Sequence, residues 1–70
     1  MELTIKFICE KAYDFMEKGK RYVGVTVHAY DPKSDSILKC KATGLTGLKF
    51  GDDLKVYAIP NGRYINYEVA

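Results

Sequence analysis

Several residue types and sequence features are scarce or missing in this chain of 70 residues. It has no tryptophan, two cysteines, two prolines and one histidine. It also has no run near the ~20 apolar residues that a membrane-spanning helix requires. The N-terminus, Met-Glu-Leu-Thr-Ile-Lys, lacks the cationic start, the hydrophobic stretch and the small-residue cleavage site of a signal peptide. These absences predict a protein that stays out of the membrane and in the cytoplasm, where thiols remain reduced.

The residues that could support catalysis or bind a metal are too dispersed to form a recognisable site. Cys9 and Cys40 lie far apart, and the sequence has no close Cys or His pair of the kind that holds a metal ion. Both cysteines fall on predicted inward positions, where they act as small buried hydrophobes. His28 has no acid or nucleophile at a recognised spacing, and Asp52 and Asp53 point apart if they are consecutive on a strand. We therefore expect no enzyme activity, no metal and no cofactor.

One stretch, residues 19–30, alternates almost without error between apolar and polar positions. Its inward side is aliphatic, comprising Val23, Val25, Val27 and Ala29. Because successive side chains of a strand point to opposite faces, this pattern predicts a half-buried strand. Its outward side is unusual, because it carries two tyrosines and the only histidine, namely Tyr22, Thr26, His28 and Tyr30.

The preceding segment, residues 3–16, predicts a long first strand with a bulge. Its inward positions are Leu3, Ile5, Phe7 and Cys9. The alternation is lost at residues 10–12, where a β-bulge would absorb one residue and bend the strand. A short helix over residues 10–18 is the alternative, but Tyr13 and Phe15 favour strand.

Three more strands are predicted after residue 30, at residues 37–43, 53–59 and 63–69. Polar turns containing glycine or proline separate the five predicted strands at residues 17–20, at residues 31–36 and at Asn61-Gly62. The Asn61-Gly62 pair suits a two-residue hairpin turn. Residues 44–52 contain three glycines, too many for a regular helix. We expect Leu45, Leu48 and Phe50 to plug one end of the fold, and Ile65, Tyr67 and Val69 to point inward.

Five short strands without a convincing helix predict an all-β protein with a single domain over residues 1–70. A small five-stranded OB-like barrel fits the spacing best, and an SH3-like barrel is the alternative. The OB-like prediction rests on the long bulged first strand, followed by two hairpins that an interruption separates.

Positive charge gathers in the middle of the chain, although the formal net charge is only +2. If strands 19–30 and 37–43 form a hairpin, Lys39 and Lys41 share the outward face of the tyrosines, and Lys20 and Arg21 lead into it. Aromatic rings among cations are what a single-stranded nucleic acid needs, since rings stack on bases and cations hold phosphates. The candidate binding residues are therefore Lys20, Arg21, Tyr22, His28, Tyr30, Lys39 and Lys41. The ordinary alternative is that tyrosines pack across strands on a sheet surface.

Short motifs in this region resemble the gene V-type helix-destabilising, single-stranded-DNA-binding proteins of filamentous phages. The similar stretches are Gly-Lys-Arg-Tyr at 19–22, Ala-Tyr-Asp at 29–31, the Gly-Leu at 44–45 and a last strand after a glycine turn. The resemblance implies an OB-like dimer that coats single-stranded DNA during phage DNA replication, with Lys20, Arg21, Tyr22 and Tyr30 on the DNA surface. The chain leaves less room than that family has for a long dimer-forming hairpin.

The sequence predicts a non-enzymatic protein that binds single-stranded DNA or RNA without sequence preference, from a phage or another mobile element. Two alternatives stay open: an SH3-like protein-interaction module, and a small inhibitor of a host enzyme. The outward residues Ile8, Ile37 and Ile59 would form an interface if they clustered, and we expect a homodimer.

Overall fold

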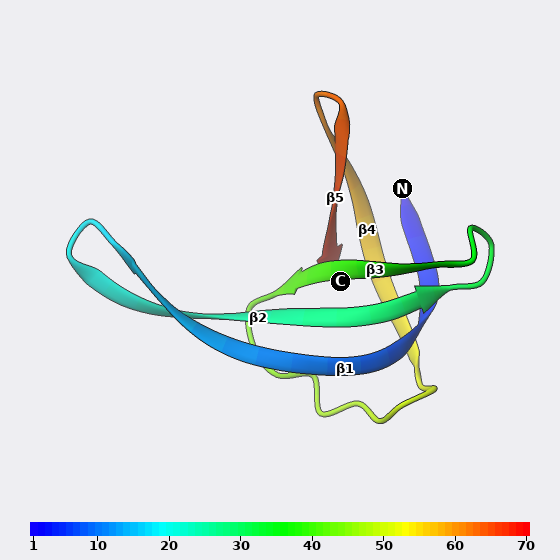
Figure 1. The fold of residues 1–70 in the computed structure, drawn as a ribbon, viewed down its shortest axis with the longest axis horizontal. Coiled ribbons are helices and arrows are strands. Elements are labelled where there is room, and N and C mark those ends of the chain that lie inside the picture. The colour runs from blue at the N-terminus through cyan, green and yellow to red at the C-terminus, as the bar shows by residue number, and fades with distance from the viewer.

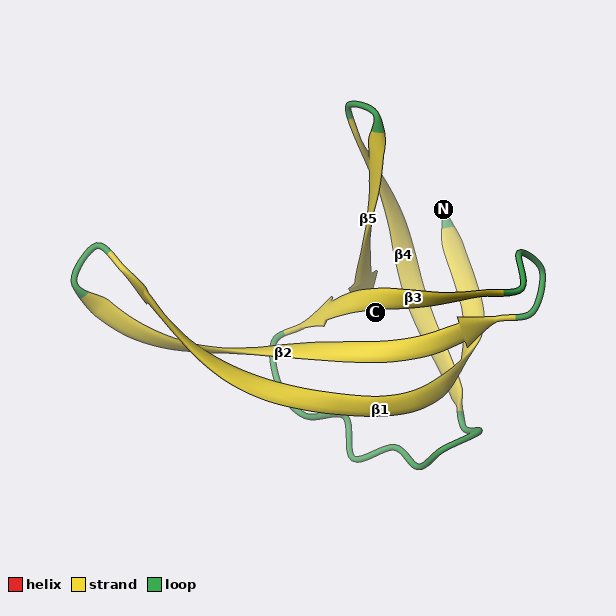
Figure 2. Cartoon of the chain, viewed as in Figure 1, coloured by secondary structure: helices red, strands yellow, loops and turns green.

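The computed structural model covers residues 1–70 and consists of five strands joined by turns and one long loop, with no helix (Figure 2). The strands are β1 (Glu2–Glu17), β2 (Lys20–Asp31), β3 (Ser36–Ala42), β4 (Asp53–Asn61) and β5 (Tyr64–Val69). They close into a barrel in the order β1-β2-β3-β5-β4, in which β4 returns to β1 and only β3 and β5 run parallel. This is a small OB-like barrel, so the predicted fold class is confirmed.

Two tight turns fix the hairpins, and each has glycine where the backbone needs a positive φ. Lys18 and Gly19 join β1 to β2 with φ of 50° and 76°, the pattern of a type I′ turn. In the β4–β5 hairpin, Asn61 still pairs with Tyr64, so the two turn residues are Gly62 and Arg63. The prediction of Asn61-Gly62 as the turn was therefore displaced by one residue.

The bulge in β1 lies between Phe7 and Cys9, not at residues 10–12 as predicted. At this point β1 stops pairing with β4, and Phe7 exchanges backbone hydrogen bonds of 2.8 Å with Gly51 and Asp52 instead. The extra residue reverses the alternation beyond it. Cys9 consequently pairs with His28 on the outer surface and is exposed, so the prediction that Cys9 is buried was wrong.

The core is small and apolar, and it comes mainly from β1, β2 and β4. Its fully buried members are Ile5, Phe7, Val25, Val27, Ala29, Cys40, Leu54, Val56 and Ala58. All of them lie on positions that the alternation predicted to be inward. Tyr67 and Val69 of β5 pack against this core, whereas Ile65 and Val23, also predicted inward, are more than half exposed.

The β1–β2 hairpin continues well beyond the barrel, and we call this extension, residues 13–24, the arm. Residues 13–17 pair only with residues 20–24, because β3 pairs with β2 from Val25 onwards. Figure 1 shows the arm projecting along the longest axis of the molecule, which measures 41 Å against 16 Å for the shortest. Gly24 is the only buried residue in the arm. Val23 is exposed because no third strand pairs with the arm.

A loop over residues 43–52 crosses one end of the barrel, at the bottom of Figure 1. Glu10 holds it: its carboxylate accepts hydrogen bonds from the Thr46 N–H at 2.7 Å, the Thr46 hydroxyl at 3.0 Å and the Gly47 N–H at 3.1 Å. Leu48 packs against the core, but Leu45 and Phe50 are exposed. Of the three residues predicted to plug the end of the barrel, only Leu48 does so, and hydrogen bonds to Glu10 hold the rest of the loop in place.

Candidate functional site

The outer surface of β2 and its neighbours carries a compact set of basic residues. Thr26 pairs with Lys11 of β1 on one side and with Lys41 of β3 on the other. Two residues further along β2, His28 lies between Cys9 and Lys39, and the Cys9 Sγ is 3.6 Å from the His28 Nδ1. Lys39 and Lys41 thus share the face of His28, as the sequence predicted. Lys11 joins them because the bulge turns it outward.

Three aromatic rings lie together where this surface continues onto the arm. Phe15 pairs with Tyr22 across the hairpin, and their rings stack with centroids 5.5 Å apart and an interplanar angle of 22°. Tyr13, two residues before Phe15 on the same face, has its ring centroid 6.0 Å from that of Phe15. We call Tyr13, Phe15 and Tyr22 the aromatic cluster. Its rings are about two-fifths exposed, from 39% for Phe15 to 43% for Tyr22.

Gly24 provides the space for one of these rings. It is the register partner of Tyr13, and a Cβ atom at Gly24 would lie 2.5 Å from the Cζ atom of Tyr13. The Tyr13 ring therefore lies directly over a backbone without a side chain. Any larger residue at position 24 would push the ring away from the sheet.

Tyr13 and Phe15 are the site residues that sequence reasoning missed. The sequence pattern identifies them only as apolar positions of the first strand. The polar turn at residues 17–20 contained the missing signal, because pairing Glu17 with Lys20 across that turn places Phe15 opposite Tyr22.

Tyr30 lies at the other end of β2, far from the aromatic cluster. Eight residues at about 3.3 Å each separate it from Tyr22, a span of roughly 26 Å. The Tyr30 hydroxyl donates to the Asp35 carboxylate at 2.6 Å. This hydrogen bond, together with partial burial and the nearby charge of Asp31, raises the pKa of the phenol. The two tyrosines on which the sequence prediction rested therefore do not form one stacking platform, and Tyr30 stands beside acidic groups.

Arg21 does not share the surface of the lysines. It is adjacent to Tyr22 on β2 and so points to the opposite face of the arm, where it pairs with Met16 and forms an ion pair with Asp14. The prediction that Arg21 lies beside Tyr22 on one binding surface was wrong. Lys20 does lie on the face of Tyr22, at the tip of the arm opposite Glu17.

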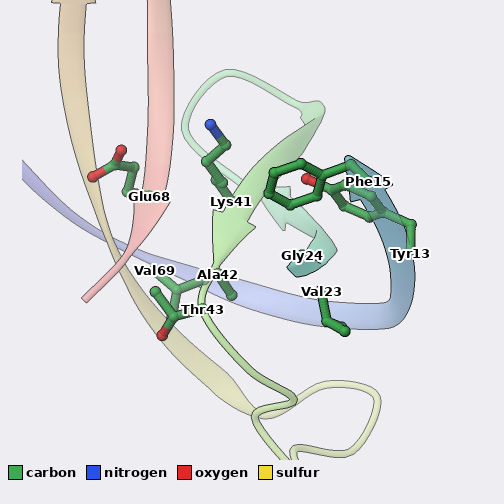
Figure 3. Close-up of a pocket in the computed structure, with 9 residues that line it drawn as sticks. All are labelled: Tyr13, Phe15, Val23, Gly24, Lys41, Ala42, Thr43, Glu68 and Val69. Carbon is green, nitrogen blue, oxygen red and sulfur yellow. The ribbon is translucent and has the colours of Figure 1, made fainter. Parts of the chain in front are cut away.

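A hollow of about 490 Å³ lies where the arm meets the barrel (Figure 3). Tyr13 and Phe15 form one side, and Lys41 and Glu68 stand beside them. The remaining lining residues are Val23, Gly24, Ala42, Thr43 and Val69. A second, smaller hollow of about 290 Å³ adjoins it and shares Tyr13, Lys41 and Glu68. The aromatic cluster is therefore continuous with the lysine-bearing strands through a concave surface.

The remaining chemistry of the chain is sparse. Both thiols are free, and burial raises the pKa of Cys40 to about 11, which keeps that thiol neutral. No group of three His, Cys, Asp or Glu side chains is placed to hold a metal ion. No helix in the structure could cross a membrane. The outward isoleucines lie on three different strands and are not register partners, so the homodimer stays a prediction.

Comparison with known proteins gives no relative of this chain. No family model, no curated protein and no solved structure matches it. The likeness to gene V-type proteins therefore stays a prediction from short motifs.

Proposed function

We propose that the protein binds single-stranded DNA or RNA, with bases stacked on the aromatic cluster and phosphates held by Lys11, Lys39 and Lys41. Binding of this kind tolerates any sequence, because every base has a π-face and every nucleotide has a phosphate. The oligonucleotide-binding face of OB barrels is formed by strands 2 and 3 and the adjacent loops. The lysines and the arm lie on that face of this barrel.

The observation that carries the proposal is the exposed aromatic cluster beside the lysines. The three partly exposed rings lie outside the apolar core of the barrel, so they are not required to form that core. Each ring leaves apolar surface in water, which costs free energy unless a ligand covers it. A stacked base covers such a ring, and stacking contributes about 1–3 kcal/mol per base by alanine substitution.

The proposal gives the earlier candidates unequal roles. Tyr22 becomes part of the platform, and His28 lies among the lysines. Tyr30 makes a smaller contribution, because Asp31 and Asp35 beside it repel phosphate. Arg21 is engaged by Asp14 on the other face. Lys20 lies at the tip of the arm, so it would contact a bound nucleic acid only there.

The test is a titration of intrinsic tyrosine fluorescence with oligothymidylate at two salt concentrations. Binding should weaken as salt rises, with a log–log slope of about −0.7 for each neutralised phosphate, or roughly −2 for three lysines. Tyr22→Ala should weaken binding by about 5- to 150-fold, the equivalent of one stacked base.

Tyr57 provides a matched control for Tyr22. Its side chain is 44% exposed, against 43% for Tyr22, but it points outward from β4, pairing with Glu2 and Glu68. Tyr57→Ala should therefore leave the affinity unchanged. No binding at low salt, or equal losses in the two variants, would refute the proposal.

A protein-interaction module is the second candidate, and the apolar hollow beside Tyr13 and Phe15 favours it. Proline-rich peptides dock in aromatic-lined grooves. A proline-rich peptide that binds tightly at any salt concentration, together with oligonucleotides that do not bind, would support this alternative.

A further inference from the structure

The larger hollow combines three kinds of chemistry within one small space. Figure 3 shows Tyr13 and Phe15 at one side of the hollow, Lys41 next to them, and Glu68 beyond Lys41 with its carboxylate turned away from the rings. Its volume of about 490 Å³ lies within the roughly 300–1,000 Å³ usual for small-molecule sites. A nucleobase that stacks on either ring would present an edge to Lys41, and the exposed Glu68 side chain would turn to meet the same edge.

Lys41 and Glu68 are direct register partners in the parallel pairing of β3 with β5. Neither takes part in an ion pair, since the two ion pairs of the structure are Lys6–Asp53 and Arg21–Asp14. Both side chains are exposed. Exposed charges of opposite sign attract each other only weakly in water, so a ligand can separate them at little cost.

A carboxylate on this surface calls for an explanation, because it repels the phosphates that Lys39 and Lys41 attract. Its chemistry suits the edge of a base instead. An ionised carboxylate has two acceptor oxygens and binds two adjacent N–H donors at once. An ammonium has three donors and binds a carbonyl oxygen.

Among the common bases, guanine alone offers a carbonyl next to two adjacent N–H donors, as O6, N1–H and N2–H₂. Thymine and uracil instead place their single N–H between two carbonyl oxygens, which a carboxylate repels. Cytosine and adenine each offer one amino group beside an acceptor nitrogen. A neighbouring lysine and glutamate therefore discriminate most strongly between guanine and thymine.

We propose that the hollow is a base subsite that prefers guanine to thymine, with Glu68 accepting from N1–H and N2–H₂ and Lys41 donating to O6. The inference rests on the proposed function and adds a preference at one nucleotide to binding that otherwise tolerates any sequence. The preference should be about five- to tenfold in affinity. This is the low end for a bidentate base contact, because the hollow is open to water.

The experiment compares three octanucleotides: all thymidine, thymidine with one central guanosine, and thymidine with one central inosine. Inosine keeps O6 and N1–H but lacks the amino group, so it should bind with an intermediate affinity. The wild-type protein should bind the guanosine octamer about five- to tenfold more tightly than the thymidine octamer.

Two variants with the same change of charge isolate the role of Glu68. Glu68→Gln should abolish most of the preference, while its affinity for the thymidine octamer stays equal or rises slightly because a negative charge is lost. Glu2→Gln changes the charge equally on the β1–β4 side of the barrel and should keep the preference.

The outcomes separate this inference from the function on which it rests. Equal binding of the three octamers by the wild-type protein would overturn the guanine subsite alone. A preference that survives in Glu68→Gln would also overturn it, since another group would then read the base. If none of the octamers binds at low salt, the proposed function fails and the subsite fails with it.

Discussion

The barrel and the arm are built from the same two strands, yet they use apolar residues in opposite ways. Where β1 and β2 belong to the barrel, alternate residues are buried almost completely, as with Ile5 at 1% and Val27 at 0% exposed. In the arm the alternation continues, but no third strand or second layer covers either face. Val23, at an aliphatic position of the same pattern, is therefore 61% exposed.

This difference shows that periodicity predicts which residues share a face, but not whether that face is covered. Burial requires a second surface at the right distance. In the barrel, β4 and β5 supply that surface. In the arm nothing within the chain does, so Tyr13, Phe15 and Tyr22 cover only one another and Gly24. Under the proposed function, the bases of a nucleic acid cover them.

The two regions should differ most in the stability that is lost when one apolar residue is truncated in each. Ile5→Ala should destabilise the fold by about 2–5 kcal/mol, because it leaves a cavity in a small core. Met16→Ala, at an exposed position of the arm, should change stability by no more than about 0.5 kcal/mol. Urea denaturation of the two variants measures both values. Similar losses in the two would mean that the arm is packed against something in solution.

A smaller effect on stability is expected at Glu10, which lies just before the arm and anchors the loop over residues 43–52. The hydrogen bond from the Thr46 N–H is the main cause that lowers the pKa of Glu10 below its ordinary 4.5, and the Thr46 hydroxyl and the Gly47 N–H add to it. A carboxyl group with a lowered pKa in the folded state stabilises the fold fully above 4.5. That contribution declines as the pH falls below 4.5 and is lost once the folded-state carboxyl is protonated.

Glu10→Gln should therefore lower the melting temperature at pH 7, and the gap from the wild-type protein should narrow as the pH falls below 4.5. Thermal melts at pH 7 and at several lower pH values measure that gap. Glu2→Gln, at a carboxylate without a hydrogen-bond partner, should show little change at either end of the range. A gap for Glu10→Gln that does not vary with pH would mean that the carboxylate charge is not what holds the loop.

The sequence was sufficient for the barrel because its alternation is regular and its turns have the right residues. The inward residues of β2 and β4 and the Lys18-Gly19 turn could be predicted from pattern alone. The outward placement of Lys39 and Lys41 also followed, since it depends only on the β2–β3 hairpin register.

The site was predicted less well, because it depends on a bulge that local pattern does not locate. Moving the bulge from residues 10–12 to Ile8 reverses the faces of residues 9–11, which lie between the two positions. Lys11 thereby joins the surface of His28, and Cys9 leaves the core. At this bend Phe7 forms backbone hydrogen bonds with Gly51 and Asp52. Such a contact between distant parts of the sequence cannot be predicted from the residues of one strand.

The smallest effect should come from adding one methyl group in the arm, at Gly24. The backbone there does not need a positive φ, so alanine fits the strand conformation, but its Cβ would meet the end of the Tyr13 ring. The ring must swing away, while the strand gains about 0.5–1 kcal/mol from the loss of glycine's flexibility. Stability should consequently change by less than about 1 kcal/mol, and binding of oligothymidylate should weaken less than it does in Tyr22→Ala.

A double-mutant cycle shows whether Gly24 acts through Tyr13. Once Tyr13→Ala has removed the ring, Gly24→Ala should have no further effect on affinity, since the methyl group then meets nothing that binds a base. Gly44→Ala is the control, because a Cβ there enters open space and the backbone again needs no positive φ. If Gly24→Ala weakens binding equally with and without the Tyr13 ring, the arm binds through its backbone edge rather than through its aromatic cluster. The contrast between a buried barrel and a ligand-covered arm would then have to be abandoned.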